Sequence, residues 1–425
     1  MRVGYGESDI TPPLGIELSG YGYFLGRKAE GVLDPLYARS VCFYDSNKTI
    51  LIISCDLIGL RKDIVEQVKA RLCKELNLSK EGIMVLCTHT HSGPATSNLI
   101  ACGEPDETYI VSIIEKIVDA GVKAFKDIQD VYRILFIDSE FDGIGYNRVF
   151  GENGCADSRV RGLLIERVND DPIALVNYAC HPVVLGVNNM ISADYPGQVV
   201  RVLNGLGYKA MFLTGFCGDI DPLVNLVKWG SGKESDVVKY GTEIANAFIN
   251  GIDSAQLLDN YTVDTFEVNA KLSLFHLTEQ SFYAEVKTFN QLYSDNPKIF
   301  KALNIWAEEK RRELGVSGAI NSEDVQIQAF KIGKTLLIGV PGEVFTEIGS
   351  IIRNGLHEFN IMLLGYANEV LRYFPTAKEI KNKGYEGYLS AFLYRRIPLL
   401  AGESERMGHI IVKTLNALLN ESSEV

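Results

Sequence analysis

Short apolar runs alternate with amphipathic stretches along most of the 425-residue chain. Runs such as TILIISC, residues 49–55, and IALVNYAC, residues 173–180, are apolar at nearly every position. Such continuity is typical of strands that are buried on both faces. Strands are predicted at 39–45, 49–56, 82–90, 132–141, 161–168, 172–181, 209–217, 335–342 and 361–368, with one or two more within 256–278.

The stretches between these runs carry apolar residues at roughly helical spacing. Helices are predicted at 62–76, 107–127, 196–206, 235–253, about 279–313, 344–357 and 403–421. The alternation of strands and helices predicts an α/β fold with a β-sheet core flanked by helices. We expect a single domain over residues 1–425, with possible halves 1–255 and 260–425 at a weak change in composition.

The composition narrows the class of protein. Hydrophobic residues make up 46% and charged residues 23%, which is typical of a soluble globular chain. The formal net charge of −12 argues against a nucleic-acid partner, because the basic footprint of such proteins is missing. The chain has no apolar run of 18 or more residues, so no transmembrane helix is predicted.

The compartment is also predicted from the sequence. The first residues, MRVGYGESDITPPLG, contain no apolar segment of the signal-peptide type. Eight cysteines are scattered without a CxxC pair, and several lie inside apolar strand-like runs. Buried, reduced thiols are expected, and the predicted location is therefore the cytoplasm.

Chemically reactive side chains follow several predicted strands at the point where the strand ends. In α/β sheets, ligands bind in the crevice at the carboxyl ends of the strands. The residues at these ends include Asp56, His89, His91, His181, Asp219, Asp221, Glu343 and Asn368. Several strands that deliver histidines and carboxylates to one edge predict a binding or catalytic site there.

Two of the six histidines, His89 and His91, lie one residue apart in the segment THTHSGP. In an extended segment, residues i and i+2 point to the same side, roughly 6.5–7 Å apart. Both imidazoles can therefore share a metal ion, or one can bind the metal while the other handles protons or substrate. The alternative is a locally hydrogen-bonded pair of core histidines, but two histidines at a strand end favour a site.

His181 follows another predicted strand and precedes Pro182, and Glu343 follows the strand predicted at 335–342. Three histidines and one carboxylate have the composition of a zinc site with an open coordination position. These candidates span residues 89–343, so they form no motif of fixed spacing.

Other polar residues near the predicted strand ends have two interpretations each. Asp219 and Asp221 in the segment GDID are suited to capping a turn, which is the commoner role. In a metal pocket, Asp221 is instead a candidate general base or second carboxylate ligand. Arg148, Tyr373 and Tyr385 lie in predicted loops, where surface exposure or packing is the usual role.

Taken in order, the motifs resemble those of the catalytic domain of the neutral/alkaline ceramidase family. They are DITPP, THTHSGP, NR, ACHP, SADYPG, GDIDP, PGE, and YFPT followed by GYEG, from about residue 4 to about residue 390. The family consists of zinc-dependent amidases that cleave the N-acyl bond of ceramide. Each motif is short, but eight in this order are specific, and they imply a mixed α/β fold like that of the ceramidase catalytic domain.

The resemblance also implies roles for individual residues. The implied zinc ligands are His89, His181, Glu343 and Tyr373. The positions implied to line the substrate and the hydrolytic centre are His91, Arg148 and Tyr385. Tyr373 and Tyr385 keep the spacing that the family shows between its two tyrosines.

The chain departs from the family within GDIDP. The ceramidases carry a serine at this point that is thought to take part in amide cleavage, whereas this chain has Asp221. A carboxylate cannot act like a serine hydroxyl, although it can serve as a base or bind metal. We also expect that the family's C-terminal immunoglobulin-like domain and secretory signal are missing.

The resulting hypothesis is a hydrolase that uses zinc, or another divalent transition metal, to cleave a C–N amide bond of a small N-acyl compound. His91 or Asp221 would take a proton from the metal-activated water, and Arg148 and Tyr385 would stabilise the oxyanion or hold an anionic group. The alternatives are an esterase or lactonase, a metal-dependent phosphatase, and a non-catalytic relative that binds a small molecule. The sequence carries no signal of the oligomeric state.

Overall fold

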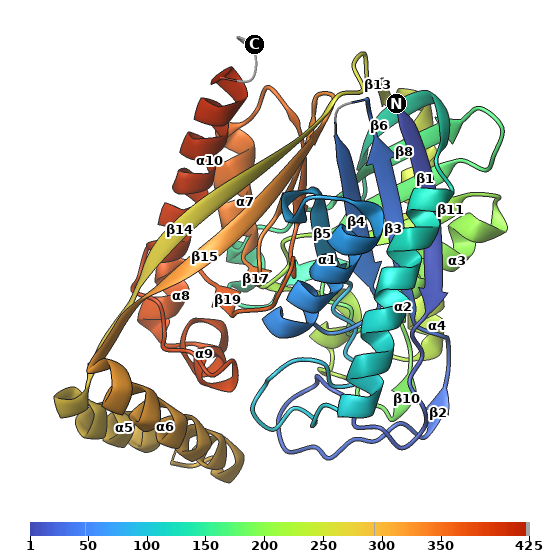
Figure 1. Ribbon diagram of the computed structural model, residues 1–425. Coiled ribbons are helices and arrows are strands. Elements are labelled where there is room, and N and C mark those ends of the chain that lie inside the picture. Colours follow the sequence, from blue (N-terminus) through green and yellow to red (C-terminus); the bar gives the residue numbers. More distant parts are fainter. Residues whose placement is uncertain (47, 293, 422–425) are drawn as a thin grey trace.

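The computed structural model describes residues 1–46, 48–292 and 294–421. Two large β-sheets pack face to face, and helices cover the outer face of each (Figure 1). The predicted fold class, a mixed α/β fold with flanking helices, is confirmed.

The first sheet is mixed. Its strands, from one edge to the other, are β11 (Lys209–Thr214), β9 (Ile173–Tyr178), β8 (Arg159–Arg167), β6 (Gln129–Glu140), β1 (Arg2–Asp9), β3 (Tyr37–Tyr44), β4 (Thr49–Cys55) and β5 (Ile83–Cys87). The pairs β11–β9 and β4–β5 at the two edges are parallel, and the pairs between them are antiparallel. A short strand, β13 (Gln256–Leu257), pairs with β6.

The second sheet follows the order β14 (Val263–Thr278), β15 (Ala319–Ile332), β16 (Thr335–Gly339) and β18 (Asn360–Leu364). The antiparallel strands β14 and β15 form a long hairpin, visible in Figure 1 as two tilted ribbons. The strands β16 and β18 are parallel, so their carboxyl ends lie at the same edge.

Helices complete the outer layers. The helices α1 (Lys62–Leu76), α2 (Glu107–Lys126), α3 (Asp194–Gly205) and α4 (Glu234–Asn250) share one apolar core with the first sheet. The helices α7 (Thr346–Gly355) and α10 (Glu403–Glu421) share a second core with the other sheet. Within the described part of the chain, no helix combines the length and apolar character needed to cross a bilayer.

The strand β4 illustrates why the apolar runs are continuous. Ile50 and Ile52 contribute to the core between the two sheets, whereas Leu51 and Ile53 belong to the core under the helices. Successive side chains of a strand point to opposite faces. Because both faces are buried here, no polar alternation remains, and the sequence pattern predicted this strand correctly.

The strands predicted between 39 and 217, and those at 335–342 and 361–368, are confirmed as β3, β4, β5, β6, β8, β9, β11, β16 and β18. The strands β1 and β15 were not predicted. The first half of β15 extends beyond the core and carries exposed polar residues, so its pattern is not that of a buried strand.

One predicted helix was wrong. The segment 279–313 forms two helices, α5 (Glu279–Leu292) and α6 (Pro297–Ser317), and position 293 lies outside the described residues. The Asn296 side chain accepts hydrogen bonds from the backbone N–H groups of Lys298 and Ile299, and Pro297 occupies the first turn. Asparagine at the N-cap and proline at N1 start a helix rather than continue one.

The remaining elements are short. They are β2 (Gly31–Val32), β7 (Gly145–Asn147), β10 (Met190–Ile191), β12 (Ile220–Pro222), β17 (Glu343–Val344), β19 (Tyr373–Phe374), α8 (Ala377–Asn382), a π-helical turn (Tyr385–Leu389), α9 (Ser390–Leu393) and several 3₁₀ turns. The strand β12 pairs with β7, and β17 pairs with β19, so these segments bring distant parts of the chain together at the strand ends.

The helix α6 holds α9 through Trp306. Its ring packs against Phe289 and Phe392, and its indole N–H donates to the Arg396 carbonyl over 2.8 Å. We expect Trp306→Ala to lower the free energy of unfolding by about 3–5 kcal/mol, because it leaves a large cavity in a buried cluster. Urea denaturation measures the loss. The matched control is Val316→Ala in the same helix, where the side chain is 91% exposed and a change within about 0.5 kcal/mol is expected.

Candidate metal and catalytic site

The carboxyl ends of parallel strands from both sheets meet at the site. His89 follows β5, His181 follows β9, and Asp221 follows β11, all from the first sheet. Glu343 follows β16 and Tyr366 follows β18, from the second sheet. The sequence predicted reactive side chains at the ends of these strands, and the structure brings those strand ends together at one site.

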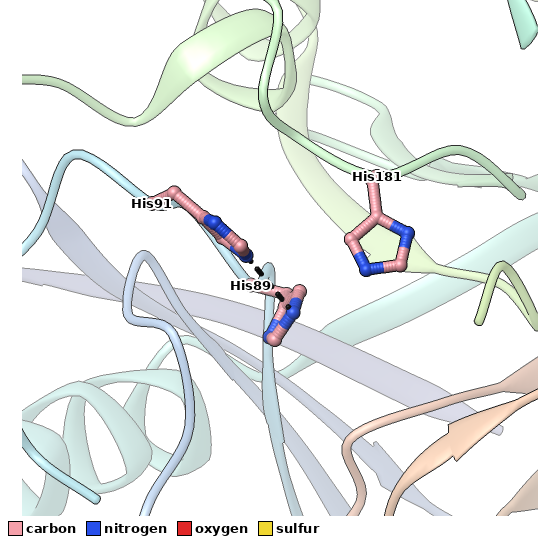
Figure 2. A group of neighbouring side chains, drawn as sticks. All are labelled: His89, His91 and His181. Carbon is pink, nitrogen blue, oxygen red and sulfur yellow. Dashed lines mark hydrogen bonds between the residues drawn. The ribbon is translucent and has the colours of Figure 1, made fainter. Parts of the chain in front are cut away.

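Three histidines form the centre of this site. The ring nitrogens that His89, His91 and His181 turn toward one another all lie within 4.8 Å (Figure 2). His89 and His181 are buried, and His91 is half-buried. His89 has a φ angle of 69°, in the left-handed region that non-glycine residues seldom adopt. Strain of this kind is frequent at functional sites.

The outer nitrogens of two rings are fixed by backbone carbonyls. His89 Nδ1 lies 2.6 Å from the Ile58 carbonyl oxygen. His181 Nδ1 lies 2.7 Å from the Cys217 oxygen and 3.1 Å from the Ile220 oxygen. A carbonyl can only accept, so each Nδ1 carries a proton, and each Nε2 faces the site. This is the arrangement of metal-binding histidines, whose second nitrogen donates to an oxygen acceptor.

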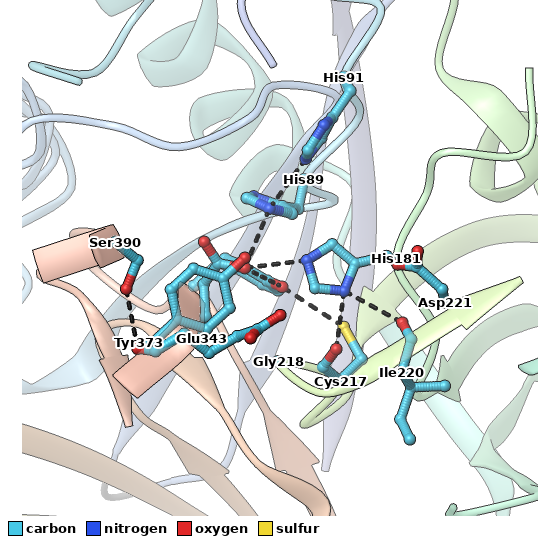
Figure 3. A network of polar contacts seen from close by, with 12 residues as sticks. His89, His91, His181, Cys217, Gly218, Ile220, Asp221, Glu343, Tyr373 and Ser390 are labelled. Atoms are coloured by element: carbon cyan, nitrogen blue, oxygen red, sulfur yellow. Dashed lines mark hydrogen bonds and ion pairs between the residues drawn. The ribbon is translucent and has the colours of Figure 1, made fainter. Parts of the chain in front are cut away.

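The Glu343 carboxylate lies between these two rings (Figure 3). Its Oε2 atom is 2.9 Å from His181 Nε2 and 3.4 Å from His89 Nε2. All three side chains are almost completely buried. Two imidazole nitrogens and one carboxylate thus face a common point from three different strand ends.

His91 has a different protonation pattern. Its Nδ1 accepts a hydrogen bond of 3.1 Å from the Tyr21 backbone N–H. In the neutral ring the proton therefore lies on Nε2, which is 3.2 Å from His89 Nε2. The His91 ring can take this position only because residue 20 is glycine. A β-carbon at position 20 would come within 2.5 Å of the ring. His91 consequently presents a donor to the site, whereas His89 and His181 can present lone pairs.

Burial and neighbouring charges set the protonation of the cluster. Burial lowers the pKa of His89, and burial together with the other two histidines lowers that of His91 much further. Burial opposes ionisation of Glu343, but His89 and His181 outweigh it and hold the pKa well below its usual range. Burial and the nearby Arg148 cation both act to lower the pKa of His181. Its contacts with Cys217 and Glu343 outweigh them and raise that pKa to about 10. The Glu343–His181 pair therefore holds one proton that a divalent cation could replace.

Two tyrosines complete the surroundings of Glu343, and sequence reasoning missed both. Tyr366 stacks on His89 with ring centroids 4.0 Å apart, and its hydroxyl is 3.5 Å from Glu343 Oε2. The Tyr394 hydroxyl donates to Glu343 Oε1. Tyr366 lies near the end of the strand predicted at 361–368, so its position was a usable signal. Tyr394 lies outside every motif, and nothing in the sequence pointed to it.

We expect Tyr394→Phe to lower the free energy of unfolding by about 1.5–3 kcal/mol, because a hydrogen bond to a buried carboxylate is lost. Urea denaturation in the presence of a chelator measures this loss without a contribution from metal. Tyr283→Phe serves as the control, since Tyr283 is 67% exposed. Equal stability of the two variants would contradict the contact.

Arg148 joins several parts of the site. Its Nη1 lies 2.9 Å from Asp221 Oδ1, and its Nε lies 2.9 Å from Glu386 Oε1. Its Nη2 donates to the Tyr373 hydroxyl oxygen over 2.9 Å and to the Gly218 carbonyl over 3.0 Å. Both Nη atoms therefore donate within the protein, and the guanidinium lies between two carboxylates. Glu386 belongs to the GYEG motif but was not recognised from the sequence as a site residue.

Asp221 is completely buried and also engaged through both oxygens. Besides the ion pair with Arg148, its Oδ2 accepts from the Trp229 indole N–H over 3.0 Å and from the Asn225 amide over 3.4 Å. Its neighbour Asp219 is directed elsewhere and accepts from Thr346 and Asn147. The two aspartates therefore do not form a common carboxylate pair.

Tyr373 and Tyr385, the two tyrosines singled out by the resemblance, lie next to each other. Their ring centroids are 6.0 Å apart in an edge-to-face arrangement. Tyr373 is buried beside Arg148, and burial raises its pKa despite the opposing effect of that cation. Tyr385 is 42% exposed, so it lies at the rim of the site. The eight candidates for metal binding and catalysis thus lie in one connected group. Of the other strand-end residues, Asp56 pairs with Arg39 and Asn368 donates to Gln328.

The donor set fits a divalent transition metal. Two deprotonated imidazole nitrogens, a buried carboxylate and a nearby tyrosine hydroxyl are ligand types that zinc and related ions accept. The carbonyls behind His89 and His181 provide the supporting contacts that such sites require. Fold and site together define an α/β protein with a buried histidine–carboxylate centre that could hold a metal ion.

Comparison with known proteins gives a more specific result. Residues 1–137 match the family model of the N-terminal part of neutral/alkaline non-lysosomal ceramidase. The chain is 23% identical to the neutral ceramidase of Mycobacterium tuberculosis, with 92% of this chain and 74% of that protein aligned. It is 22% identical to neutral ceramidase A of Dictyostelium discoideum, with 92% and 70% aligned.

The fold agrees with these matches. The crystal structure of neutral ceramidase from Pseudomonas aeruginosa superposes with a TM-score of 0.76 and covers 99% of this chain and 74% of that one, at 19% identity. The resemblance to the neutral/alkaline ceramidase family, first seen in the order of short motifs, is confirmed.

Proposed function

We propose that this protein is a metal-dependent hydrolase that cleaves the C–N amide bond of an N-acyl compound. The observation that carries the proposal is the convergence of His89 Nε2, His181 Nε2 and the Glu343 carboxylate in a buried site. The similarity to proteins named neutral ceramidase supports the amide bond as the target, because a ceramidase cleaves an N-acyl linkage.

The proposed metal ligands are His89, His181 and Glu343, with Tyr373 as the fourth by family resemblance. A zinc ion bound there would lower the pKa of a bound water and polarise a carbonyl oxygen.

The protonation of His91 supports a role as a donor. Because Nδ1 accepts from Tyr21, the Nε2–H group points into the site, where it lies 3.2 Å from His89 Nε2. With a metal on His89 Nε2, this group would be free to donate to the carbonyl oxygen of the substrate. A donor directed at an oxygen that gains negative charge accelerates the reaction strongly. This argument replaces the role of proton acceptor that the sequence also allowed for His91.

Asp221 and Arg148 are better suited to positioning than to contact with substrate. Both Asp221 oxygens accept hydrogen bonds, and the Arg148 donors are occupied by Asp221, Tyr373 and Gly218. We infer that this pair orients Tyr373. Tyr385, whose side chain is 42% exposed, lies at the rim where an incoming substrate would pass.

The contacts of Asp219 and Asp221 favour an amidase over a two-metal phosphatase. A second metal needs free carboxylate oxygens, whereas Asp219 is engaged by Thr346 and Asn147 and Asp221 by Arg148. An esterase or lactonase would use the same centre, and only the choice of substrate distinguishes it.

The test uses protein purified without chelator and a panel of N-acyl amines and N-acyl amino acids, with matched esters, lactones and phosphate monoesters. Release of the free amine, measured with an amine-reactive dye, is expected for the amides and is expected to stop after metal removal. Turnover of esters or phosphate esters alone would overturn the proposal. So would amide cleavage that persists in metal-free protein.

A further inference from the structure

A cavity of about 620 Å³ lies behind the histidine site. Its walls come from the start of α1, from residues 97–99, from segment 394–396 and from α6. The helix α1 packs with the first sheet and α6 with the second, so the cavity lies between the two halves of the fold. Ligand pockets are frequent at such boundaries, and this volume is large enough for a small organic molecule.

Tyr394 connects this cavity to the site. Its side chain lines the cavity, and its hydroxyl donates to Glu343 Oε1. None of the three site histidines belongs to the lining. The cavity is therefore a neighbour of the histidine site rather than a part of it.

The cavity is lined by ionisable side chains of both signs, and we call it the charged cavity. Most of these side chains are paired. Lys310, for example, pairs with Glu313 over 2.8 Å. Glu369 and Arg396 are matched less completely, and these two groups indicate what the cavity accepts.

Glu369 is a largely buried carboxylate with few partners. Its side chain is 19% exposed, and its ion pair with Lys62 spans 3.9 Å. It accepts no hydrogen bond from the part of the chain that the structure describes. Burial raises the pKa of Glu369, although Lys62 and Arg396 act to lower it. Because a desolvated carboxylate gains most from a donor of positive charge, Glu369 is suited to bind an ammonium group.

Arg396 shares one carboxylate with a second arginine. Glu323 Oε1 lies 2.8 Å from Arg396 Nη1, and Glu323 Oε2 lies 2.7 Å from Arg372 Nε. Arg372 is almost completely buried, whereas the Arg396 side chain is 38% exposed and lines the charged cavity. One carboxylate balances only one of the two positive charges. Arg396 is therefore suited to bind a carboxylate.

Uncharged residues complete the wall. Ser97 is 8% exposed, and its hydroxyl has no hydrogen-bond partner among the described residues. Buried polar groups of this kind are rare, and each one indicates a partner that the protein itself does not supply, such as water or a ligand. Leu60, Leu99 and Val370 add apolar surface to the same cavity.

We propose that the charged cavity binds a small zwitterion that carries an ammonium group and a carboxylate, such as an α-amino acid with an apolar side chain. Glu369 binds the ammonium group, and Arg396 binds the carboxylate. A free amino acid and a short peptide share this chemistry. The inference does not depend on the proposed amide cleavage, because the two binding groups lie outside the histidine site.

The test is isothermal titration calorimetry of the intact chain with leucine. Two probes of matched shape lack one charge each: isoamylamine keeps the ammonium group, and isocaproate keeps the carboxylate. Leucine is expected to bind about 10–100-fold more tightly than either probe, because each charged hydrogen bond contributes separately. Leucyl-leucine distinguishes the two sources. Tighter binding than leucine identifies a peptide ligand, and weaker binding identifies a free amino acid.

Two variants are expected to give a crossed pattern. Glu369→Gln weakens the binding of leucine and isoamylamine about 10–100-fold and leaves that of isocaproate unchanged. Arg396→Gln weakens the binding of leucine and isocaproate and leaves that of isoamylamine unchanged. A folding defect would weaken all three probes alike. The matched control is Glu66→Gln, since Glu66 lines the same cavity but its carboxylate is bound to Lys80 over 2.6 Å.

An amino acid can also chelate a metal ion, so the titrations are repeated after treatment with a chelator. Leucine binding that disappears with the metal overturns the inference. Absence of binding at millimolar leucine, or equal affinity for leucine and its two analogues, also overturns it. If leucine binds with the crossed pattern but no N-acyl compound is cleaved, the proposed function fails and the assignment of the charged cavity stands.

Discussion

His89→Ala is expected to abolish stoichiometric metal binding. His89 Nε2 faces the Glu343 carboxylate, and its Nδ1 is fixed by the Ile58 carbonyl, so the ring has one available orientation. Loss of supporting contacts alone lowers metal affinity about 10–100-fold, and loss of a ligand costs more. Elemental analysis of protein purified without chelator measures the result, and circular dichroism confirms the fold.

His91→Ala provides the matched comparison, because His91 lies two residues away in the same cluster. We expect it to retain the metal and to lower kcat by about 10²–10³-fold, the effect of removing one donor from a developing oxyanion. The conservative variant His91→Gln, whose side-chain amide can donate, is expected to recover part of the rate.

The two variants therefore separate the roles of the histidines. Metal retained in His89→Ala, or metal lost in His91→Ala with the fold intact, would contradict the assignment based on protonation. Loss of metal in His91→Ala would favour a site in which all three histidines are ligands, and the distances between their ring nitrogens permit such a site.

Asp221→Ala is the second change with a large expected effect. It removes the partner of Arg148 in a buried ion pair and the acceptor of the Trp229 indole. Loss of one member of a buried pair typically costs about 3–5 kcal/mol, because the other charge remains buried. We expect a loss of this size in urea denaturation, reduced to the extent that Glu386 continues to pair with Arg148.

Two further variants sharpen this prediction. Glu166→Ala breaks the exposed pair with Arg133, and a loss of no more than about 1 kcal/mol is expected. Asp221→Ser introduces the serine that the family resemblance implies at this position. It is expected to be destabilised like Asp221→Ala, because serine carries no charge. A stable Asp221→Ser protein would show that the ion pair contributes little.

The fold could be predicted where local pattern and burial agree. Continuous apolar runs predicted β4, β5, β9 and β11 because both faces of the first sheet are covered. The boundary between α5 and α6 was missed, although Asn296 and Pro297 are local signals that could have revealed it. The strand β15 gave no such signal, because its first half is exposed and polar and lies in the sheet through its pairing with β14.

The site could be predicted only in part. The positions of the histidines and of Glu343 at strand ends were visible in the sequence, and the structure brings them together. The hydroxyl that donates to Glu343 comes from Tyr394, far along the chain and outside every motif. The sequence offered Asp221 as a possible base, but its actual contacts include Trp229 and Arg148, and these depend on how two loops pack.

Local patterns in the sequence were enough to predict the alternation of strands and helices, the residues at the strand ends, and the family resemblance carried by eight short motifs. These features are local, so each can be recognised before any tertiary contact is known. Only the packing of the fold decided that His91 turns an Nε2–H group toward the site, whereas His89 and His181 bond backbone carbonyls through Nδ1 and turn Nε2 inward as possible metal ligands. The reason is physical: the tautomer of a histidine depends on the partner of its other nitrogen, and those partners are the backbone groups of Tyr21, Ile58 and Cys217.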